Sequence, residues 1–362
     1  MSSKTLGFLG ILVAVAFPSL PARAEVVKTL RAQIPGAASG AFAVENLLGS
    51  MRVTAGSTDA AVVVATIHAA DDELATSVHL EEVRGENGVP TLRVRYPTSP
   101  RTLRYPGSDH NRDWDGFVFF GEGNTETYDG RRYRVSRHHG TLLYGDVEVQ
   151  VPARVASGTF REVVGQLEAG GLEGKLFFRV ASADLRLDDV RGEVDLEGSS
   201  GNTRASRVRG QWRSDFSSGD CELDRFEGSL ASFHTSSGDV SVRNLVADRL
   251  TVETSSGDAH VHDADVREVE AHASSGDLSF DSAGRRLARV RAESSSGDVH
   301  LALASDASFS AEGDQSSGDM RVRFEDGERK YRRGELVSFR RGTGGAEIRV
   351  RTSSGDFTID PR

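Results

Sequence analysis

Cysteine is almost absent from this sequence, since Cys221 is the only one among 362 residues. A single thiol excludes an intramolecular disulfide framework, so side-chain packing and backbone hydrogen bonds must stabilise the fold. Long apolar runs are also missing, because nothing after residue 24 approaches the length of a transmembrane helix. The sequence therefore predicts a protein that has no transmembrane segment once its first residues are removed.

Residues 1–24 have the pattern of a secretory signal peptide. Lys4 gives a positive start, residues 6–20 a short apolar stretch, and Ala22-Arg23-Ala24 an Ala-x-Ala cleavage site. We therefore expect an exported protein, located in the periplasm, at the cell surface or in the medium. Removal of Lys4 and Arg23 takes the formal net charge from −10 to −12. Such an acidic protein is poorly suited to nucleic acid, so we expect no nucleic-acid partner.

A Ser-Ser-Gly-Asp turn recurs along the second half of the chain. The intervals between successive turns are 18 to 21 residues until a last interval of 37. The turn residues that we expect to be structural are Gly201, Gly219, Asp220, Gly238, Asp239, Gly257, Asp258, Gly276, Asp277, Gly297, Asp298, Gly318, Asp319, Gly355 and Asp356. A fixed period of this length is typical of a solenoid.

The residues after each turn alternate between apolar and polar, as in Val240-Ser241-Val242, which is the signature of a strand. A second strand, such as residues 250–254, leads into the next turn. Because 19 residues are too few for a strand-helix-strand unit, coil should stack on coil with parallel strands. We predict an all-β fold: a parallel β-solenoid, β-helix-like, with two-strand coils of 18–21 residues.

The turn residues have plausible structural roles. Glycine supplies a positive φ for a tight turn, and Ser and Asp side chains bond nearby backbone N–H groups. Stacking would place the Asp side chains in one column, where neighbouring carboxylates about 5 Å apart in water repel by roughly 1 kcal/mol per pair. Cation binding along this edge is the functional alternative to a purely structural column.

The N-terminal part of the sequence does not show the repeat. Residues 25–155 are β-rich but irregular, with an aromatic and polar insertion at about 97–142, and we place the repeat domain at 156–362. Within the insertion, Asn111, Asp113, Asp115 and Glu122 have the ligand spacing of a calcium loop. An Asp- and Asn-rich hairpin turn is the alternative, so calcium is the only cofactor that the sequence suggests.

The long last interval contains a second excursion, at about 325–345, that is locally basic. Its cations are Arg329, Lys330, Arg332, Arg333, Arg340 and Arg341. They could bind an anionic ligand such as an acidic glycan or a phosphorylated lipid headgroup. A solvated hairpin arm is the simpler interpretation.

No catalytic constellation emerges from the repeat. Its serines recur in every turn, whereas a nucleophile needs one specific base and an oxyanion site. With the coils stacked in chain order, the outward column four residues past each turn Asp reads Asp224, Arg243, His262, Asp281, Ala302, Arg323, Asp360. Its closest acids would lie three coils, or roughly 14 Å, apart, which is too far for glycoside hydrolysis. We therefore predict no enzyme activity.

The run from Tyr144 to Pro152 and the recurrent Ser-Ser-Gly-Asp turns resemble the bacterial putative-adhesin family, a domain of unknown function related to the head domain of putative autotransporter adhesins. The resemblance implies a β-helix-like fold in exported or envelope proteins and carries no catalytic motif. We expect a non-catalytic exported scaffold or adhesin with an envelope or surface partner, either a glycan or a protein. The alternatives are a carbohydrate-active β-helix enzyme, such as a polysaccharide lyase or hydrolase, and a calcium-dependent binding module.

Overall fold

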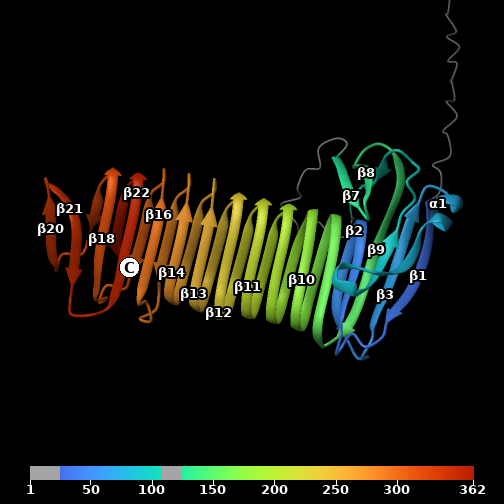
Figure 1. Ribbon diagram of the computed structural model, residues 1–362, viewed down its shortest axis with the longest axis horizontal. Helices are drawn as coiled ribbons and strands as arrows, with labels where there is room; N and C mark the ends of the chain where they lie inside the picture. Colours follow the sequence, from blue (N-terminus) through green and yellow to red (C-terminus); the bar gives the residue numbers. More distant parts are fainter. Residues whose placement is uncertain (1–24, 108–123) are drawn as a thin grey trace, which may run out of the picture.

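The computed structural model describes residues 25–107 and 124–362. Its strands lie side by side in a long rod that is widest at the N-terminal end (Figure 1). The helical elements of the described residues are short: α1 (Asp72–Ser77) and η1 (Glu86–Gly88). The strands of the N-terminal part are β1 (Val26–Ile34), β2 (Ala41–Gly56), β3 (Ala61–Ala69), β4 (His79–Arg84), β5 (Pro90–Arg95), β6 (Leu103–Arg104), β7 (Asn124–Tyr128), β8 (Arg131–Ser136) and β9 (Thr141–Pro152).

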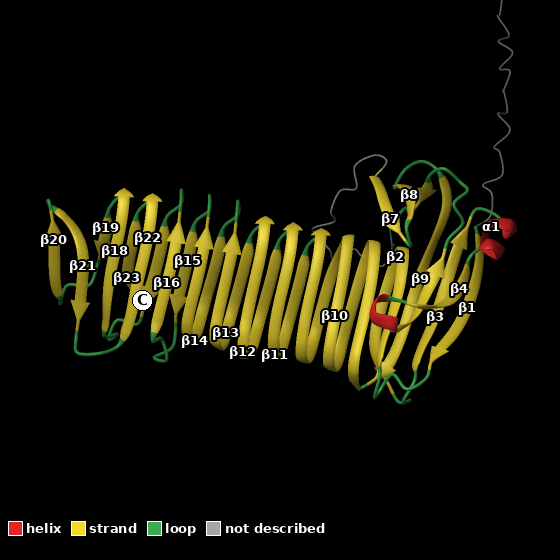
Figure 2. Ribbon diagram, in the orientation of Figure 1, coloured by secondary structure: helices red, strands yellow, loops and turns green. Residues whose placement is uncertain are grey.

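Apart from an antiparallel hairpin at 328–341, the rest of the chain winds into coils whose strands run parallel to one another (Figure 2). Strands β10 to β14 pair in parallel, each with the next. This confirms the predicted parallel β-solenoid. The strands of this part are β10 (Arg154–Ser200), β11 (Thr203–Ser218), β12 (Cys221–Ser237), β13 (Val240–Thr254), β14 (Ala259–Ala273), β15 (Leu278–Ser282), β16 (Arg289–Ser294), β17 (Val299–Leu303), β18 (Phe309–Ser317), β19 (Met320–Val322), β20 (Glu328–Arg332), β21 (Glu335–Arg341), β22 (Ala346–Ser354) and β23 (Phe357–Pro361).

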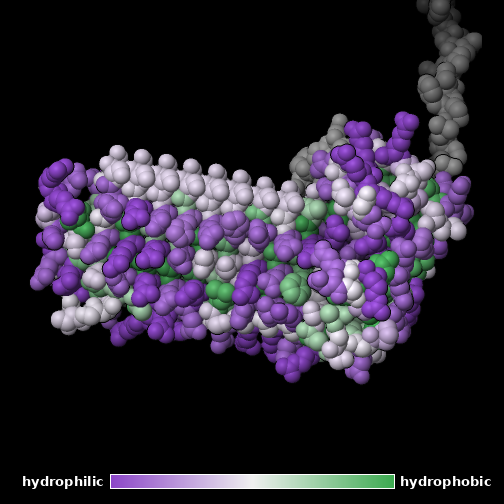
Figure 3. Space-filling view, in the orientation of Figure 1, coloured by the Kyte–Doolittle hydropathy of each residue, from purple (hydrophilic) through white to green (hydrophobic). Residues whose placement is uncertain are grey.

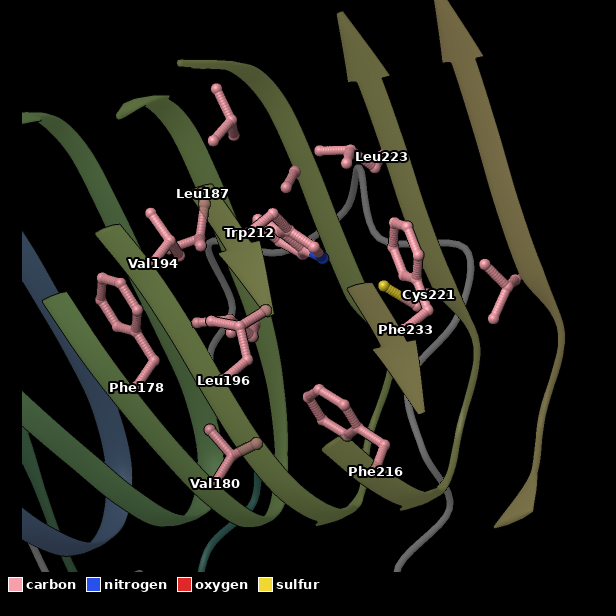
Figure 4. Close-up of a cluster of buried hydrophobic side chains, with 14 of the residues drawn as sticks. Phe178, Val180, Leu187, Val194, Leu196, Trp212, Phe216, Cys221, Leu223 and Phe233 are labelled. Carbon is pink, nitrogen blue, oxygen red and sulfur yellow. The ribbon is translucent and has the colours of Figure 1, made fainter. Parts of the chain in front are cut away.

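The core is a set of ladders that run along the rod. Trp212 and Phe233, from neighbouring coils, both point into the interior, with ring centroids 6.3 Å apart (Figure 4). Each buried apolar side chain of this size stabilises the fold by about 1.5–3 kcal/mol. Cys221 shares a ladder position with Val240, and burial raises the pKa of its thiol to about 12. This cysteine is therefore a small core residue and stays protonated at neutral pH.

The Ser-Ser-Gly-Asp turns stack into a straight edge, seen as a pale ridge of small residues in Figure 3. A Cβ atom on Gly219 would lie 2.1 Å from the carbonyl oxygen of Gly201, so the backbones of successive turns approach too closely for any side chain. The φ of Gly219 is also positive, at 108°. Glycine is thus required at this turn both by the backbone conformation and by the stacking.

The turn carboxylates link one coil to the next. The Oδ1 atom of Asp239 accepts a hydrogen bond of 2.9 Å from the backbone N–H of Asp258, and Asp220 does the same for Asp239 at 3.0 Å. Asn202 takes the same position and accepts from the N–H of Asp220 at 3.0 Å. The sequence suggested bonds within a turn, whereas these bonds run between turns and form a ladder along the rod.

Five successive coils have a further corner that the sequence analysis did not identify. Asp189, Arg207, Arg225, Asn244 and Asp263 occupy equivalent places and all have φ between 50° and 59°. The corner falls where two polar residues interrupt the alternation of each coil. The left-handed conformation costs a non-glycine residue roughly 1 kcal/mol, which the packing of the coil must offset.

The C-terminal coil does not follow chain order. Strand β22 pairs in parallel with β16 on one side and with β18 on the other. Strand β23 likewise lies between β17 and β19. The last coil of the chain is therefore inserted one layer, or rung, inside the end of the rod. The C-terminus accordingly lies short of that end in Figure 1. This corrects the expectation that coils stack in the order of the sequence.

The physical reason lies in the hairpin of β20 and β21. Strand β21 pairs antiparallel with β18, so the hairpin covers the outer edge of β18 and ends the parallel ladder. A charged, twisted edge strand of this kind blocks further pairing. Since the outer edge of β18 is occupied, the final coil can join the sheet only on the inner side of β18.

The N-terminal end contains a second rung that is out of order. Strand β2 pairs in parallel with β9 and with β10, although β9 and β10 are consecutive in the chain. The parallel ladder therefore reaches from the repeat region into the N-terminal part. The division of the chain at residues 155 and 156 stays a prediction, as does the functional role of the insertion at about 97–142.

A buried polar network lies where β2 enters the ladder. The Nδ2 atom of Asn46 donates to both carboxylate oxygens of Glu162 and to the carbonyl of Gly145, each at 3.0 Å. The hydroxyl of Tyr96 donates to Oδ1 of Asn46 at 2.8 Å. Desolvation raises the pKa of the fully buried Glu162 carboxyl well above its usual range. This rung is thus held by a specific network rather than by apolar packing alone.

Candidate binding face of the rod

One outer face of the rod carries ordered columns of charged side chains. We call it the groove face; it consists of the outward residues on the strands that lead into the Ser-Ser-Gly-Asp turns. One of its columns contains, in spatial order, Asp215, His234, Glu253, His272, Glu293, Arg351 and Asp314.

Carboxylates alternate with histidine or arginine side chains along this column. Nδ1 of His234 lies 3.1 Å from a carboxylate oxygen of Glu253, and Arg351 lies 3.6 Å from Glu293. Cross-strand pairs of this kind stabilise a sheet by a few tenths of a kcal/mol each. The carboxylates of Glu253 and Glu293 thus have basic partners within the face.

The C-terminal end of the groove face differs. There the β20–β21 hairpin stands beside the outer face of β16, β22 and β18 and encloses a groove of about 1030 Å³. We call it the C-terminal groove. The groove is lined by six cations, Arg291, Lys330, Arg332, Arg333, Arg349 and Arg351, and by four carboxylates, Glu293, Glu312, Asp314 and Glu335.

Four of these six cations are not neutralised by the protein. Within the described parts of the chain, no carboxylate lies within 4.0 Å of Arg291, Lys330, Arg332 or Arg333. By contrast, Arg349 pairs with Glu347 at 2.6 Å. The six cations and four carboxylates that line this groove give it a formal charge of +2 (6 − 4), in a chain of net charge −10.

The fold divides the six cations of the predicted basic excursion into two kinds. Arg329 donates to the backbone carbonyl of Phe324 and lies 5.0 Å from the ring centroid of Phe339, while Arg341 pairs with Asp326 at 2.8 Å. The contacts of these two arginines thus lie within the hairpin and its surroundings rather than in the groove. Lys330, Arg332 and Arg333 line the C-terminal groove, whereas the exposed Arg340 does not.

The sequence analysis missed the groove residues supplied by the sheet. Arg291, Arg349 and Arg351 belong to β16 and β22, which lie side by side only because the last coil is inserted. Arg291 and Arg349 are direct neighbours in the parallel register. The sequence showed only that these arginines alternate with apolar residues and therefore point outward from their strands. It did not show which strands are adjacent.

A second groove lies near the other end of the rod. It has a volume of about 830 Å³ and is bounded by the η1 turn, which crosses in front of the β10 coils (Figure 2). Arg179 in this groove pairs with Glu86 at 2.9 Å and with Glu197 at 3.1 Å. A hydrogen bond from Arg179 lowers the pKa of the exposed Glu86 carboxyl. Arg93 and Arg179 of this groove thus have carboxylate partners, whereas Arg161 donates to the backbone carbonyl of Thr127 at 3.4 Å.

The predicted calcium ligands, Asn111, Asp113, Asp115 and Glu122, lie outside the described residues, as does the predicted signal peptide. In the ranges 25–107 and 124–362, no group of three or more His, Cys, Asp or Glu side chains is arranged to hold a metal ion. The calcium interpretation therefore stays a prediction.

The inserted coil also changes the spacing of acids on the other outer face. Because Asp360 follows Ala302 in the ladder, Asp281 and Asp360 lie two rungs apart, about 9.6 Å, rather than the three rungs expected from chain order. Asp360 pairs with His300 at 3.0 Å and with Arg323 at 2.9 Å, and Asp281 lies 3.4 Å from Arg362. Both carboxylates thus have basic partners within the protein.

Parallel coils that stack in register and a continuous ladder of turns define a parallel β-solenoid. The chain belongs to the Toastrack DUF4097 family, whose sequence profile matches residues 145–360. This confirms the resemblance to a putative-adhesin family of unknown function. No curated protein matches the chain.

Three solved structures are similar over most of the chain. A putative cell adhesion protein from Clostridium sporogenes is 8% identical, with 94% of this chain and 99% of that chain covered and a TM-score of 0.22. A putative lipid binding protein from Parabacteroides distasonis is 11% identical, with 92% and 96% covered and a TM-score of 0.36. A putative adhesin from the same organism is 12% identical, with 91% and 97% covered and a TM-score of 0.34. Neither α1 nor η1, the helical elements of the described residues, is long enough to cross a bilayer.

Proposed function

We propose that this protein is an exported, non-catalytic scaffold, an adhesin of the cell envelope or a secreted one, that binds an acidic glycan in the C-terminal groove. The proposal rests on one observation: four cations of this groove have no carboxylate within 4.0 Å among the described residues, although the chain is acidic overall. Arginine and lysine side chains placed in this way recognise carboxylate, sulfate or phosphate groups through charge-assisted hydrogen bonds.

The shape of the site favours a glycan over a membrane surface. The cations lie in a groove between the β20–β21 hairpin and the sheet, so a single polymer chain can reach them. A flat bilayer can contact only the outside of the hairpin. The net negative charge of the protein also repels an anionic membrane at longer range.

A scaffold role fits the chemistry better than catalysis. The serines of the turns are repeated and exposed, and none of them is singled out by a base. Cys221 is buried and its raised pKa keeps it protonated. The groove itself offers six cations, and three of its four carboxylates are ion-paired, which suits binding rather than proton transfer.

The test uses the chain 25–362 and fluorescent dextran sulfate, with uncharged dextran as the reference polymer. The triple variant Lys330→Gln, Arg332→Gln, Arg333→Gln should bind dextran sulfate at least about 1000-fold more weakly, since each lost charge-assisted contact is worth roughly 1.5–3 kcal/mol and three are lost. The matched control is Arg340→Gln, which removes a charge from the same hairpin outside the groove. Equal loss in both variants, or binding of anionic vesicles but not of dextran sulfate, would refute the acidic-glycan site.

A further inference from the structure

The insertion of the C-terminal coil changes which charges are neighbours in the C-terminal groove. In the observed order, the outward residues of one column read Glu270, Arg291, Arg349 and Glu312. If the coils followed the chain, β18 would lie directly beside β16 and Arg291 would be the neighbour of Glu312. Insertion of β22 therefore replaces an opposite-charge pair by two adjacent arginines.

Two adjacent arginines across parallel strands are unfavourable on their own. Neighbouring strands are about 4.8 Å apart, and like charges directly opposite each other destabilise a sheet. Arg349 is held in place by Glu347 at 2.6 Å and lies 3.9 Å from Glu312. Arg291 has Glu270 as its ladder neighbour on the other side, but no carboxylate lies within 4.0 Å of its guanidinium among the described residues.

We propose that Arg291 and Arg349 form a paired-arginine site that binds a single oxyanion of the ligand. Occupation of this site stabilises the arrangement in which β22 lies between β16 and β18. The proposal rests on the proposed function and specifies which two residues bind the anionic group of the ligand. The ligand group is a sulfate, phosphate or carboxylate carried on a glycan. An oxyanion placed between two guanidinium groups accepts hydrogen bonds from both and removes their mutual repulsion.

The coupling follows from linkage. The paired site exists only when β22 lies beside β16, because β22 carries Arg349. A ligand that binds only the inserted arrangement shifts the equilibrium toward that arrangement. Anion binding at the groove and protection of the C-terminal coil should therefore rise together.

The first experiment is a double-mutant cycle in the chain 25–362, with dextran sulfate as the probe. Arg291→Gln and Arg349→Gln should each weaken binding about tenfold, and the double variant should be little weaker than either single variant, because both arginines hold one group. Arg289→Gln is the matched control: it removes the same charge from the same strand, at a position paired with Glu268 and Glu347 in register and outside the groove. Independent, multiplying losses, or an equal loss in the control, would overturn the paired site.

The second experiment measures amide hydrogen exchange with and without dextran sulfate. In the wild type, the probe should slow exchange of Ala346–Pro361 about tenfold, and this protection should be absent in Arg291→Gln. Polygalacturonate and polyphosphate, used in parallel, distinguish carboxylate and phosphate groups from sulfate. Protection that is unchanged by Arg291→Gln overturns the coupling alone. A wild type that binds none of the three polymers removes the proposed function as well.

Discussion

The middle of the rod and its two ends are built from similar rungs but follow the chain differently. Strands β10 to β14 stack in the order in which they occur in the sequence. At the ends, β2 lies between β9 and β10, and β22 lies between β16 and β18. The repeat thus determines the shape of a rung, while the segments at each end determine where a rung is placed.

The turn ladder shows why the rungs are interchangeable. Asp239 accepts the N–H of Asp258 from the next coil of the chain at 2.9 Å. Asp298 accepts the N–H of Asp356 at 2.8 Å, although Asp356 is 58 residues further on. The two bonds are alike because every turn presents the same donor and acceptor. A repeat of this kind contains no information about the order in which its copies stack.

The largest expected effect comes from placing a methyl group in the glycine column, once in each region. A Cβ atom on Gly257 would lie 2.1 Å from the carbonyl oxygen of Gly238, and one on Gly355 would lie 2.2 Å from that of Gly297. Gly257→Ala should lower the free energy of unfolding by about 3 kcal/mol or more, because the strain falls between two coils in the middle of the rod. Gly355→Ala should mainly increase local opening of the inserted coil and have a smaller effect on the free energy of global unfolding.

Urea denaturation followed by hydrogen exchange distinguishes these outcomes. Gly344→Ala is the control, since nothing lies within 4 Å of its added Cβ and only the strain of its positive φ, roughly 1 kcal/mol, remains. If Gly257→Ala and Gly355→Ala both lower the global stability equally, the inserted coil is as integral as the middle coils and the comparison fails.

A smaller, pH-dependent effect is expected at the N-terminal inserted rung. The folded-state pKa of Glu162 is raised by burial, so the folded protein retains its proton at a pH where the unfolded chain has lost it. Its contribution to stability is therefore complete below the unfolded pKa of about 4.5 and declines as the pH rises, by about 1.4 kcal/mol per pH unit up to the folded pKa.

Glu162→Gln removes this titration and should flatten the pH dependence of the thermal midpoint above pH 4.5. Glu168→Gln, an outward residue of the same strand that pairs with Arg52 at 3.0 Å, is the control and should leave that dependence in place. An unchanged slope in Glu162→Gln would show that this carboxyl is ionised in the folded protein.

The smallest expected effect concerns single bonds of the carboxylate ladder. Asp239→Ala and Asp298→Ala each remove one hydrogen bond between coils and should each cost about 1 kcal/mol of unfolding free energy. The matched Asn variants should cost less, because an amide oxygen still accepts the bond, as Asn202 does at 3.0 Å. If the Asn variants lose as much unfolding free energy as the Ala variants, the stabilisation comes from the negative charge and not from the hydrogen bond between coils.

Much of the regular rod could be predicted from the sequence. The recurrence of Ser-Ser-Gly-Asp and the alternation after each turn depend on local chemistry, which a sequence displays directly. The left-handed corner at Arg225 was overlooked, although the polar pair Asp224-Arg225 before the buried Phe226 interrupts the alternation and gave a usable signal.

The candidate site was predictable only in part. Lys330, Arg332 and Arg333 were identified as anion-binding candidates, yet Arg329 and Arg341 look the same in the sequence and only their partners in the fold separate them. Arg291 and Arg349 are 58 residues apart, and their adjacency depends on where the last coil is inserted. Positions of this kind follow from long-range topology, which the repeat leaves open.

Disulfide trapping tests the order of the coils most directly. Ser294 and Thr352 are buried register neighbours, and Gln315 follows Thr352 one rung further out. In a Cys221→Ala background, the pair Ser294→Cys and Thr352→Cys should form a disulfide readily. The pair Ser294→Cys and Gln315→Cys should not, because two rungs separate Cα atoms by about 9.6 Å, beyond the reach of about 7 Å. The reverse result would mean that the coils stack in chain order, and the inserted coil and its paired-arginine site would be wrong.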